Sequence, residues 1–394
     1  MVHRAIWSAV LRGGRLGIDN LTHTLVGVAI ARTGVARMTP LATTTLVIAA
    51  NAPDIDVLAF ARGPYFALAV RRGITHGWPA LVLLALVVTA VVLTWDRRVR
   101  RERRPDAAPA RAGPVLLLAT IGVASHPALD WLNTYGVRWA MPLSPEWSYG
   151  DTLFIIDPWI WLVLGGVLLL TSERSRSRDF PWSLLALLTT ALILLAPTAA
   201  AVKLVWVTGV VSIGLAGAWA RWHPPARLAA RIALVAVAAY VGAGAAANRA
   251  ARGEVLREAG TLGLEVIDVM VGPLPGAPLS SEVEVRTPNG YVPGTHRWWS
   301  TPRVRLLPER TVPARSLPDG MASAVGDEII RAAFRAPEVA DYLTWSRYPI
   351  IRVEDRGNGW RVRVGDARYD ARPEAGTLGG VETLVRPEDL RGGG

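Results

Sequence analysis

Long apolar runs separated by short polar loops dominate the first 250 residues. A helix that crosses the hydrocarbon core of a bilayer needs about 20 consecutive apolar residues. Six segments meet that length and pattern: 74–95, 113–133, 152–171, 181–197, 199–220 and 231–248. The pattern therefore predicts a bundle of membrane-spanning helices.

Two weaker apolar runs precede these six segments. Residues 20–37 and 41–52 are short and carry polar side chains. They are either full spans or re-entrant helices that pack against the other helices. Residues 1–19 carry three arginines but lack the clean apolar core of a signal peptide. We expect them to be an extension ahead of a fold that starts at Asp19.

The remaining third of the chain has a different pattern. Alternation of apolar and polar residues predicts strands at 282–286, 303–306, 350–354 and 360–364. Asn358-Gly359 is a strong hairpin signal between the last two strands. A helix is expected over 321–334, and the Pro- and Gly-rich stretch 272–318 is expected to be loops between short strands. The predicted fold class is a polytopic α-helical membrane domain, residues 1–249, with a C-terminal soluble α+β domain, residues 250–394.

Composition supports this division. Apolar residues make up 51% of the chain, and the mean hydropathy is +0.28. Charged residues are 19%, against about 25% in soluble proteins. Such hydrophobicity excludes a disordered chain. The chain has no cysteine, which excludes disulfides, thiol nucleophiles and iron–sulfur clusters. Any metal must be held by His, Asp or Glu.

The positive charge is concentrated in the loops of the first part. Residues 1–249 carry 24 basic and 12 acidic residues, whereas residues 250–394 carry 19 and 20. Seven arginines lie in 97–111, and three each in 173–179 and 221–231. These loops are two spans apart, so the positive-inside rule places all three in the cytoplasm. The prediction is a multi-pass protein of the inner membrane with its C-terminal domain outside the cytoplasm.

The near-zero net charge of residues 250–394 also affects which binding partners we expect. A near-neutral domain offers no electrostatic footprint for nucleic acid, whose binding depends on neutralising phosphates. We therefore expect no direct nucleic-acid binding by residues 250–394. The expected partner is the lipid bilayer, and the oligomeric state stays open.

Ionisable residues inside a membrane domain are costly and are usually functional. Seven acids lie outside the basic loops, and three histidines accompany them: Asp19, Asp54, Asp56, Asp130, Glu146, Asp151 and Asp157, with His23, His76 and His126. The predicted topology places all of them at the outer end of the bundle. A random scatter would not select one side.

Their spacing fits a metal site. His126 and Asp130 are i,i+4 and share one helix face. Asp54 and Asp56 follow Pro53, which ends a helix and leaves two carboxylates in a turn. The predicted ligands are His23, Asp54, Asp56, His76, His126 and Asp130. This donor set suits one or two divalent ions, with zinc expected and manganese or iron as alternatives. A bound ion would lower the pKa of water to about 7, and Asp56 or Asp130 would act as the general base.

Each residue also has a plain structural interpretation. A single His at a helix end is more often a cap or core residue than a ligand. Asp19 fits an N-cap, and Asp157 fits either a helix start or a partner of a ligand. Glu146 and Asp151 are expected to be solvated. The glycines of 214–217 and 242–244 predict close helix packing.

Four motifs give the chain a family resemblance. They are DNLTHTLVG (19–27), NAPDID (51–56), RGITHG (72–77) and SHPALDWLNTYG (125–136). In this order they resemble the inner-membrane, metal-dependent hydrolases that are also described as LexA-binding inner-membrane-associated hydrolases. The stretches YLTWSRYP (342–349) and VGDARY (364–369) are similar to the longer members.

The resemblance implies a hydrolase. A more distant similarity to zinc-dependent phospholipase C and P1-type nucleases points to phosphoester substrates. The chain departs from the family at Gly77, where many members have Ser, and at Pro127, where many have a bulky apolar residue. Neither change removes a predicted ligand, but Pro127 is expected to bend its helix near the site.

The leading hypothesis is a membrane-bound metal-dependent hydrolase. Water activated by the metal would attack a phosphoester or carboxylic ester of a lipid or lipid-linked substrate. The alternative is a non-catalytic membrane scaffold or regulator with a structural metal site, which would lack an open coordination position. A transporter is disfavoured because its site would lie near the membrane midplane.

Overall fold

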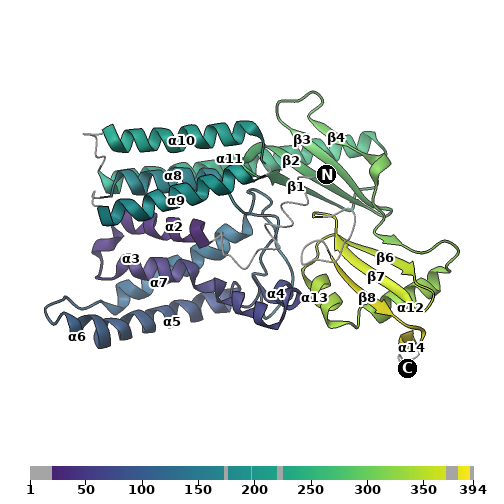
Figure 1. Ribbon diagram of the computed structural model, residues 1–394, viewed down its shortest axis with the longest axis horizontal. Helices are drawn as coiled ribbons and strands as arrows, with labels where there is room; N and C mark the ends of the chain where they lie inside the picture. Colours follow the sequence, from purple (N-terminus) through teal and green to yellow (C-terminus); the bar gives the residue numbers. More distant parts are fainter. Residues whose placement is uncertain (1–19, 173–175, 197, 220–224, 370–379, 391–394) are drawn as a thin grey trace.

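A computed structural model describes the chain apart from residues 1–19, 173–175, 197, 220–224, 370–379 and 391–394. Its first part is a bundle of helices, and its last part contains two four-stranded sheets at one end of that bundle (Figure 1). This arrangement confirms the predicted fold class, a helical membrane domain with a C-terminal α+β domain.

The main helices of the bundle overlap the predicted apolar runs. They are α2 (Asn20–Arg32), α3 (Ala42–Asn51), α5 (Trp78–Trp95), α7 (Ala112–Trp131), α8 (Pro158–Leu170), α9 (Arg176–Leu195), α10 (Ala200–Trp219) and α11 (Ala226–Thr261). Short helical segments connect them: η1 (Val35–Arg37), η2 (Ala52–Arg62), α4 (Pro64–Val70), η3 (Asp96–Arg100) and α6 (Arg101–Arg103). Within the described residues, 5 helices are long and apolar enough to cross a membrane.

The two weak apolar runs behave differently from each other. α2 has 13 residues, or about 20 Å at 1.5 Å per residue, which is shorter than the roughly 30 Å hydrocarbon core. α3 continues into the 3₁₀ segment η2, and together Ala42–Arg62 is long enough to span. Pro53 lies at the switch between the two because its nitrogen cannot donate a helical hydrogen bond. Asp54 therefore lies at the start of the 3₁₀ segment, directly after the α-helix ends.

The soluble part contains two sheets of order β1-β2-β3-β4 and β5-β6-β7-β8. The strands are β1 (Asp268–Leu274), β2 (Ala277–Thr287), β3 (Gly290–Arg297), β4 (Val304–Leu306), β5 (Arg315–Ser316), β6 (Pro349–Asp355), β7 (Trp360–Asp366) and β8 (Val381–Val385). Three of the predicted strands lie within β2, β6 and β7, and the fourth, 303–306, overlaps β4. The hairpin at Asn358-Gly359 is confirmed, because Asp355 pairs with Trp360 across it.

The Pro- and Gly-rich stretch is more regular than predicted. Residues 272–318 hold all of β2, a strand of 11 residues, and all of β3, a strand of 8 residues. A Cβ on Gly294 would lie 2.7 Å from Leu306 Cδ2 of β4. Gly294 is therefore explained by the close approach of a neighbouring strand. The prediction of loops was wrong because it treated every glycine as a turn signal.

Helices cover the second sheet. α12 (Ser323–Ala333) confirms the predicted helix, and α13 (Pro337–Trp345) follows it, while η4 (Pro308–Arg310) and α14 (Pro387–Leu390) are single turns. Ile329 of α12 and Trp345 of α13 are fully buried with Val362 of β7 in one apolar core. Leu68 of α4 joins this core, so the membrane part contributes to it.

The helix α11 connects the two parts without a break. It has 36 residues, and Val255 and Ala259 near its end pack against Val269 of β1. The predicted domain boundary at 249 and 250 falls inside this helix. The first sheet is thus built directly onto a helix that begins in the membrane bundle.

Polar contacts also fasten the second sheet to the bundle. Arg347 forms an ion pair with Asp151, and Arg368 donates a hydrogen bond of 2.7 Å to the carbonyl oxygen of Thr134. The expectation that Asp151 is solvated was wrong, because its exposed fraction is 8%. Burial acts to raise the pKa of Asp366, but the Arg368 guanidinium outweighs it and holds that pKa below its usual value. The buried Asp366–Arg368 pair therefore orients the guanidinium that reaches Thr134.

Candidate metal centre

The four motifs meet at the end of the bundle that faces the sheets (Figure 1). His23 lies in the first turn of α2, Asp54 lies in η2, and His76 lies in the turn before α5. His126 and Asp130 lie in the last two turns of α7. All five side chains are buried, with Asp54 the most exposed at 8%.

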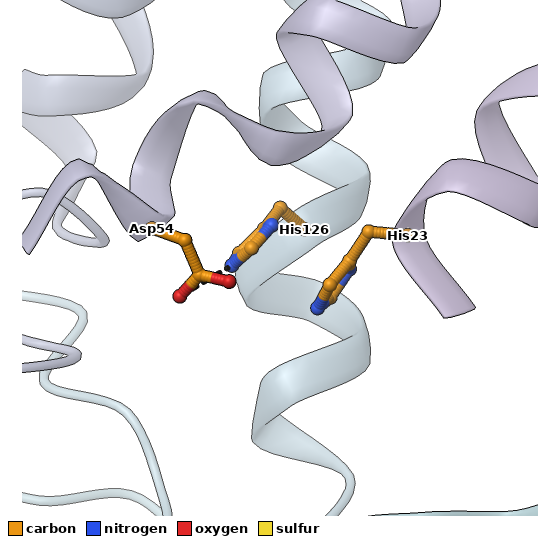
Figure 2. A group of neighbouring side chains, drawn as sticks. All are labelled: His23, Asp54 and His126. Carbon is orange, nitrogen blue, oxygen red and sulfur yellow. Dashed lines mark ion pairs between the residues drawn. The ribbon is translucent and has the colours of Figure 1, made fainter. Parts of the chain in front are cut away.

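Two groups of these side chains are close enough to hold a metal ion. One consists of His23, Asp54 and His126, and the other of His76, His126 and Asp130. In each group, one ligand atom from each residue lies within 4.8 Å of the others. Figure 2 shows the first group, in which His23 and Asp54 approach His126 from either side. The rings of His23 and His126 are stacked, with centroids 3.7 Å apart.

The separations between donor atoms match those of a coordination shell. Asp130 Oδ2 lies 3.2 Å from His76 Nε2 and 3.5 Å from His126 Nε2. His126 Nε2 lies 3.7 Å from Asp54 Oδ1. Two ligands of one tetrahedral zinc are about 3.4 Å apart, given zinc–ligand distances of about 2.0–2.2 Å. The donor set therefore fits an ion such as zinc.

Three of these potential metal-ligand atoms have no hydrogen-bond partner in the described part of the chain. They are His76 Nε2, His126 Nε2 and Asp130 Oδ2, and all three are buried. Leaving a buried polar atom unsatisfied costs about 1–3 kcal/mol, and more for a charged group. A cation among them would satisfy all three at once.

The backbone fixes the tautomer of His126. Its Nδ1 lies 2.6 Å from the carbonyl oxygen of Ala50, which can only accept a hydrogen bond. Nδ1 therefore carries the proton, and Nε2 presents its lone pair to the cluster. This contact needs α3 close to α7. Gly122, one turn before His126, permits it, because a Cβ there would lie 2.6 Å from Ala49 Cβ.

His76 is oriented by a relay to Asp56. The Thr75 hydroxyl donates to Asp56 Oδ2 at 3.0 Å and accepts from His76 Nδ1 at 2.9 Å. The backbone N–H of Arg72 also donates to Asp56 Oδ2. Asp56 itself belongs to neither of the two groups found among the described residues.

Two arginines that sequence reasoning did not select surround the carboxylates. Arg72 Nη2 donates to Asp130 Oδ1 at 2.8 Å, which leaves Oδ2 facing the histidines. Arg71 lies 3.2 Å from Asp54 Oδ1 and 3.4 Å from Asp56 Oδ1. Arg72 opens the third motif, and that position was the signal that could have identified it. Arg71 precedes the motif and gave no signal.

The other ionisable residues lie outside the cluster. Asp157 is the N-cap of α8, where its Oδ1 accepts from the backbone N–H groups of Trp159 and Ile160. This geometry agrees with the helix-start interpretation. Glu146 is exposed, as expected. Asp19 lies outside the described residues.

The two departures from the family pattern have local explanations. A Cβ on Gly77 would collide with the carbonyl oxygen of Met141, so the close approach of that loop requires glycine. Pro127 lies inside α7, yet the helix continues to Trp131. The i,i+4 pair on either side of this proline remains in place, with His126 Nε2 3.5 Å from Asp130 Oδ2.

The two groups share a single donor atom. His126 offers only Nε2, since Nδ1 is bonded to Ala50. One imidazole nitrogen binds one ion at a time. The two groups therefore meet at His126 Nε2.

Comparison with known proteins gives one match. Residues 18–200 match the family described as "YdjM inner membrane protein". The matched region is a little under half of the chain, and it contains all the residues of the cluster. No curated protein and no solved structure matches the chain. Together with its apolar helices, the match supports a multi-pass protein of the inner membrane.

Proposed function

We propose that the protein is a metal-dependent hydrolase of the inner membrane that cleaves a phosphoester in a lipid or lipid-linked substrate. The observation that carries this proposal is the buried cluster of His76, His126 and Asp130. The potential metal-ligand atoms that these residues turn toward one another have no hydrogen-bond partner among the described residues. His23 and Asp54 complete the proposed ligand set. A divalent ion bound there would lower the pKa of a bound water and polarise the ester oxygen.

The cluster is most accessible at Asp54. The side chain of Asp54 is 10% exposed, whereas those of the three histidines are 0–1% exposed. Arg71 lies beside Asp54, and its side chain is 24% exposed. A substrate therefore approaches past Arg71, because this is the most exposed edge of the cluster.

Arg71 favours a phosphoester over a carboxylic ester. Guanidinium groups bind phosphate oxygens through short, charge-assisted hydrogen bonds. The carboxylates of Asp54 and Asp56, 3.2 and 3.4 Å from Arg71, hold its guanidinium in place. A neutral carboxylic ester offers no charge for this cation. We therefore assign Arg71 to binding the phosphoryl group.

The two carboxylates predicted as bases have different surroundings. Asp56 accepts hydrogen bonds at both oxygens, and one of its donors, Thr75, contacts His76. This arrangement makes Asp56 a positioning residue. Asp130 Oδ2 has no described hydrogen-bond donor, although Oδ1 is bonded to Arg72. Because the same Oδ2 is a proposed ligand atom, Asp130 holds the ion in this proposal rather than acting as the general base.

The test is hydrolysis by the purified full chain in mild detergent. The assay compares bis(p-nitrophenyl) phosphate and p-nitrophenyl phosphate with p-nitrophenyl butyrate, after loading with zinc, manganese or iron. We expect turnover of a phosphoester that is lost on chelation and restored by metal. Arg71→Ala should lower kcat/KM by about 10- to 100-fold, the range for one charge-assisted hydrogen bond.

A nearby exposed arginine provides the matched control. Arg62→Ala removes a cation at the end of η2 and should leave turnover unchanged. Stoichiometric metal without turnover of any ester would contradict the hydrolase and favour the scaffold with a structural metal site. Equal losses in Arg71→Ala and Arg62→Ala would remove Arg71 from the site.

A further inference from the structure

A cavity with a volume of about 470 Å³ lies among α2, α8, α9 and α10. These helices lie together on one side of the bundle (Figure 1). The volume is in the range of about 300–1,000 Å³ that small-molecule sites occupy. Most of its wall is apolar, with Leu25, Trp161 and Trp206 among the lining residues. Because these helices belong to the membrane bundle, the surrounding solvent is lipid.

Two glycines create this space. A Cβ on Gly165 of α8 or on Gly214 of α10 would meet no described atom within 4 Å. On the same two helices, a Cβ on Gly166 would lie 2.7 Å from Ile213 Cδ1, and a Cβ on Gly209 would lie 2.5 Å from Leu162 Cδ2. The expectation of close packing at 214–217 was therefore wrong for Gly214. Gly166 and Gly209 bring the helices together, and Gly165 and Gly214 leave a groove beside that contact.

The groove has a polar, cationic end. Ser172, just after the end of α8, and Ser183, two turns into α9, line this end. Arg32 of α2 donates to Ser172 Oγ at 3.0 Å and to the carbonyl oxygen of Leu168 at 2.9 Å. Leu21 lines the cavity at the opposite end of α2. A long apolar wall with a cation at one end is complementary to an anionic lipid.

We propose that this groove binds one acyl chain of an anionic phospholipid, with the phosphate of its head group at Arg32. The lipid comes from the leaflet on the side of the basic loops, because Ser172 directly precedes the loop 173–179. The chain then extends along Gly165 and Gly214 toward Trp161.

This site is distinct from the metal centre and goes beyond the proposed function. Leu21 and Leu25 line the groove, whereas His23, between them, lies on the opposite face of α2. Trp161 links the two faces, because its Nε1 donates to Thr22 Oγ1 at 2.8 Å. An acyl chain packed against Trp161 would therefore support the helix that carries His23, whether or not the chain is a hydrolase.

The test is native mass spectrometry of the full chain released from nanodiscs of phosphatidylglycerol and phosphatidylcholine. We expect the wild type to retain one phosphatidylglycerol per chain. Gly165→Leu and Gly214→Leu each fill the groove and should lower that occupancy at least tenfold. Gly242→Leu in α11 is the matched control, because its Cβ also meets no described atom within 4 Å and it lies outside the groove.

The head-group contact has its own variant. Arg32→Gln should reduce the preference for phosphatidylglycerol over phosphatidylcholine while the acyl chain still binds. Circular dichroism identifies any variant that fails to fold. If either Gly165→Leu or Gly214→Leu fails to fold, the other one provides the test of the groove. Full lipid retention in a folded leucine variant, or no retained lipid in the wild type, would overturn the proposal. Loss of a dimer instead of a lipid would assign the groove to a second copy and would also overturn it.

Discussion

At the scale of single residues, the cluster is defined by which oxygen of each carboxylate is already bonded. Arg72 occupies Asp130 Oδ1 and leaves Oδ2 facing His76 and His126. Asp56 has both oxygens bonded to donors outside the cluster. Two aspartates with the same sequence-level prediction therefore have different roles in our proposal. No spacing rule distinguishes them, because the donors come from elsewhere in the chain.

This distinction gives a graded prediction for metal content. His126→Ala or Asp130→Ala should remove most of the bound metal, because each deletes a proposed ligand. Asp56→Ala should weaken metal affinity by about 10- to 100-fold, as loss of a partner of a ligand does. Membrane insertion should survive in His126→Ala and Asp130→Ala, since the span only becomes more apolar. Elemental analysis of the purified proteins measures the effect.

Glu146→Ala in the exposed loop is the control for this series. It should keep the metal content of the wild type. Full metal occupancy in both His126→Ala and Asp130→Ala, or an equal loss in the control, would leave a capped helix end as the better interpretation of these two residues.

At the scale of elements, the site depends on how closely α3 approaches α7. Gly122 faces Ala49 and Ala50, and the carbonyl oxygen of Ala50 holds His126. Gly122→Leu should push α3 away, break that hydrogen bond and move Asp54 out of reach of His126. We expect lower metal content and a lower Tm. Both are measured on purified protein by elemental analysis and thermal unfolding.

The matched control for this helix contact is Gly113→Leu, at the other end of α7. A Cβ on Gly113 would meet no described atom within 4 Å, so this change should leave both quantities near those of the wild type. If Gly122→Leu retained its metal and its Tm, the approach of α3 to α7 would not be what positions His126.

The sequence predicted the elements better than their meeting points. Apolar runs located the helices, but two predicted spans, 152–171 and 181–197, hold the shorter apolar helices Pro158–Leu170 and Phe180–Leu195. The pair His126 and Asp130 followed from helical periodicity alone. His23, His76 and His126 come from separate segments of the chain. Helical periodicity therefore does not predict that their rings lie close together. The motifs indicated which residues belong together, and only the fold showed that Arg71 and Arg72 join them.

At the scale of the whole molecule, the sheets and the basic loops should lie on opposite sides of the membrane. The three basic loops agree on one side, and α11 begins at Ala226, within the third of them. Alkaline phosphatase fused after Gly394 should be active, because it folds only outside the cytoplasm, and a fluorescent protein fused there should be dark. Fusions within 97–111 should give the opposite pattern and serve as the control. A fluorescent C-terminal fusion would reverse the orientation.

The continuity of α11 has a geometric consequence for the first sheet. The helix has 36 residues, or about 54 Å, so it exceeds the roughly 30 Å hydrocarbon core. Because each helical residue adds about 100° of rotation and 1.5 Å of rise, the azimuth of the first sheet about the helix axis is set by a residue count. Inserting one residue before Ala251 would swing that sheet through more than a quarter turn. Seven residues would nearly restore its azimuth while lifting it by about 10 Å. The sheet can therefore keep its angular register or its height above the bilayer after such an insertion, but not both.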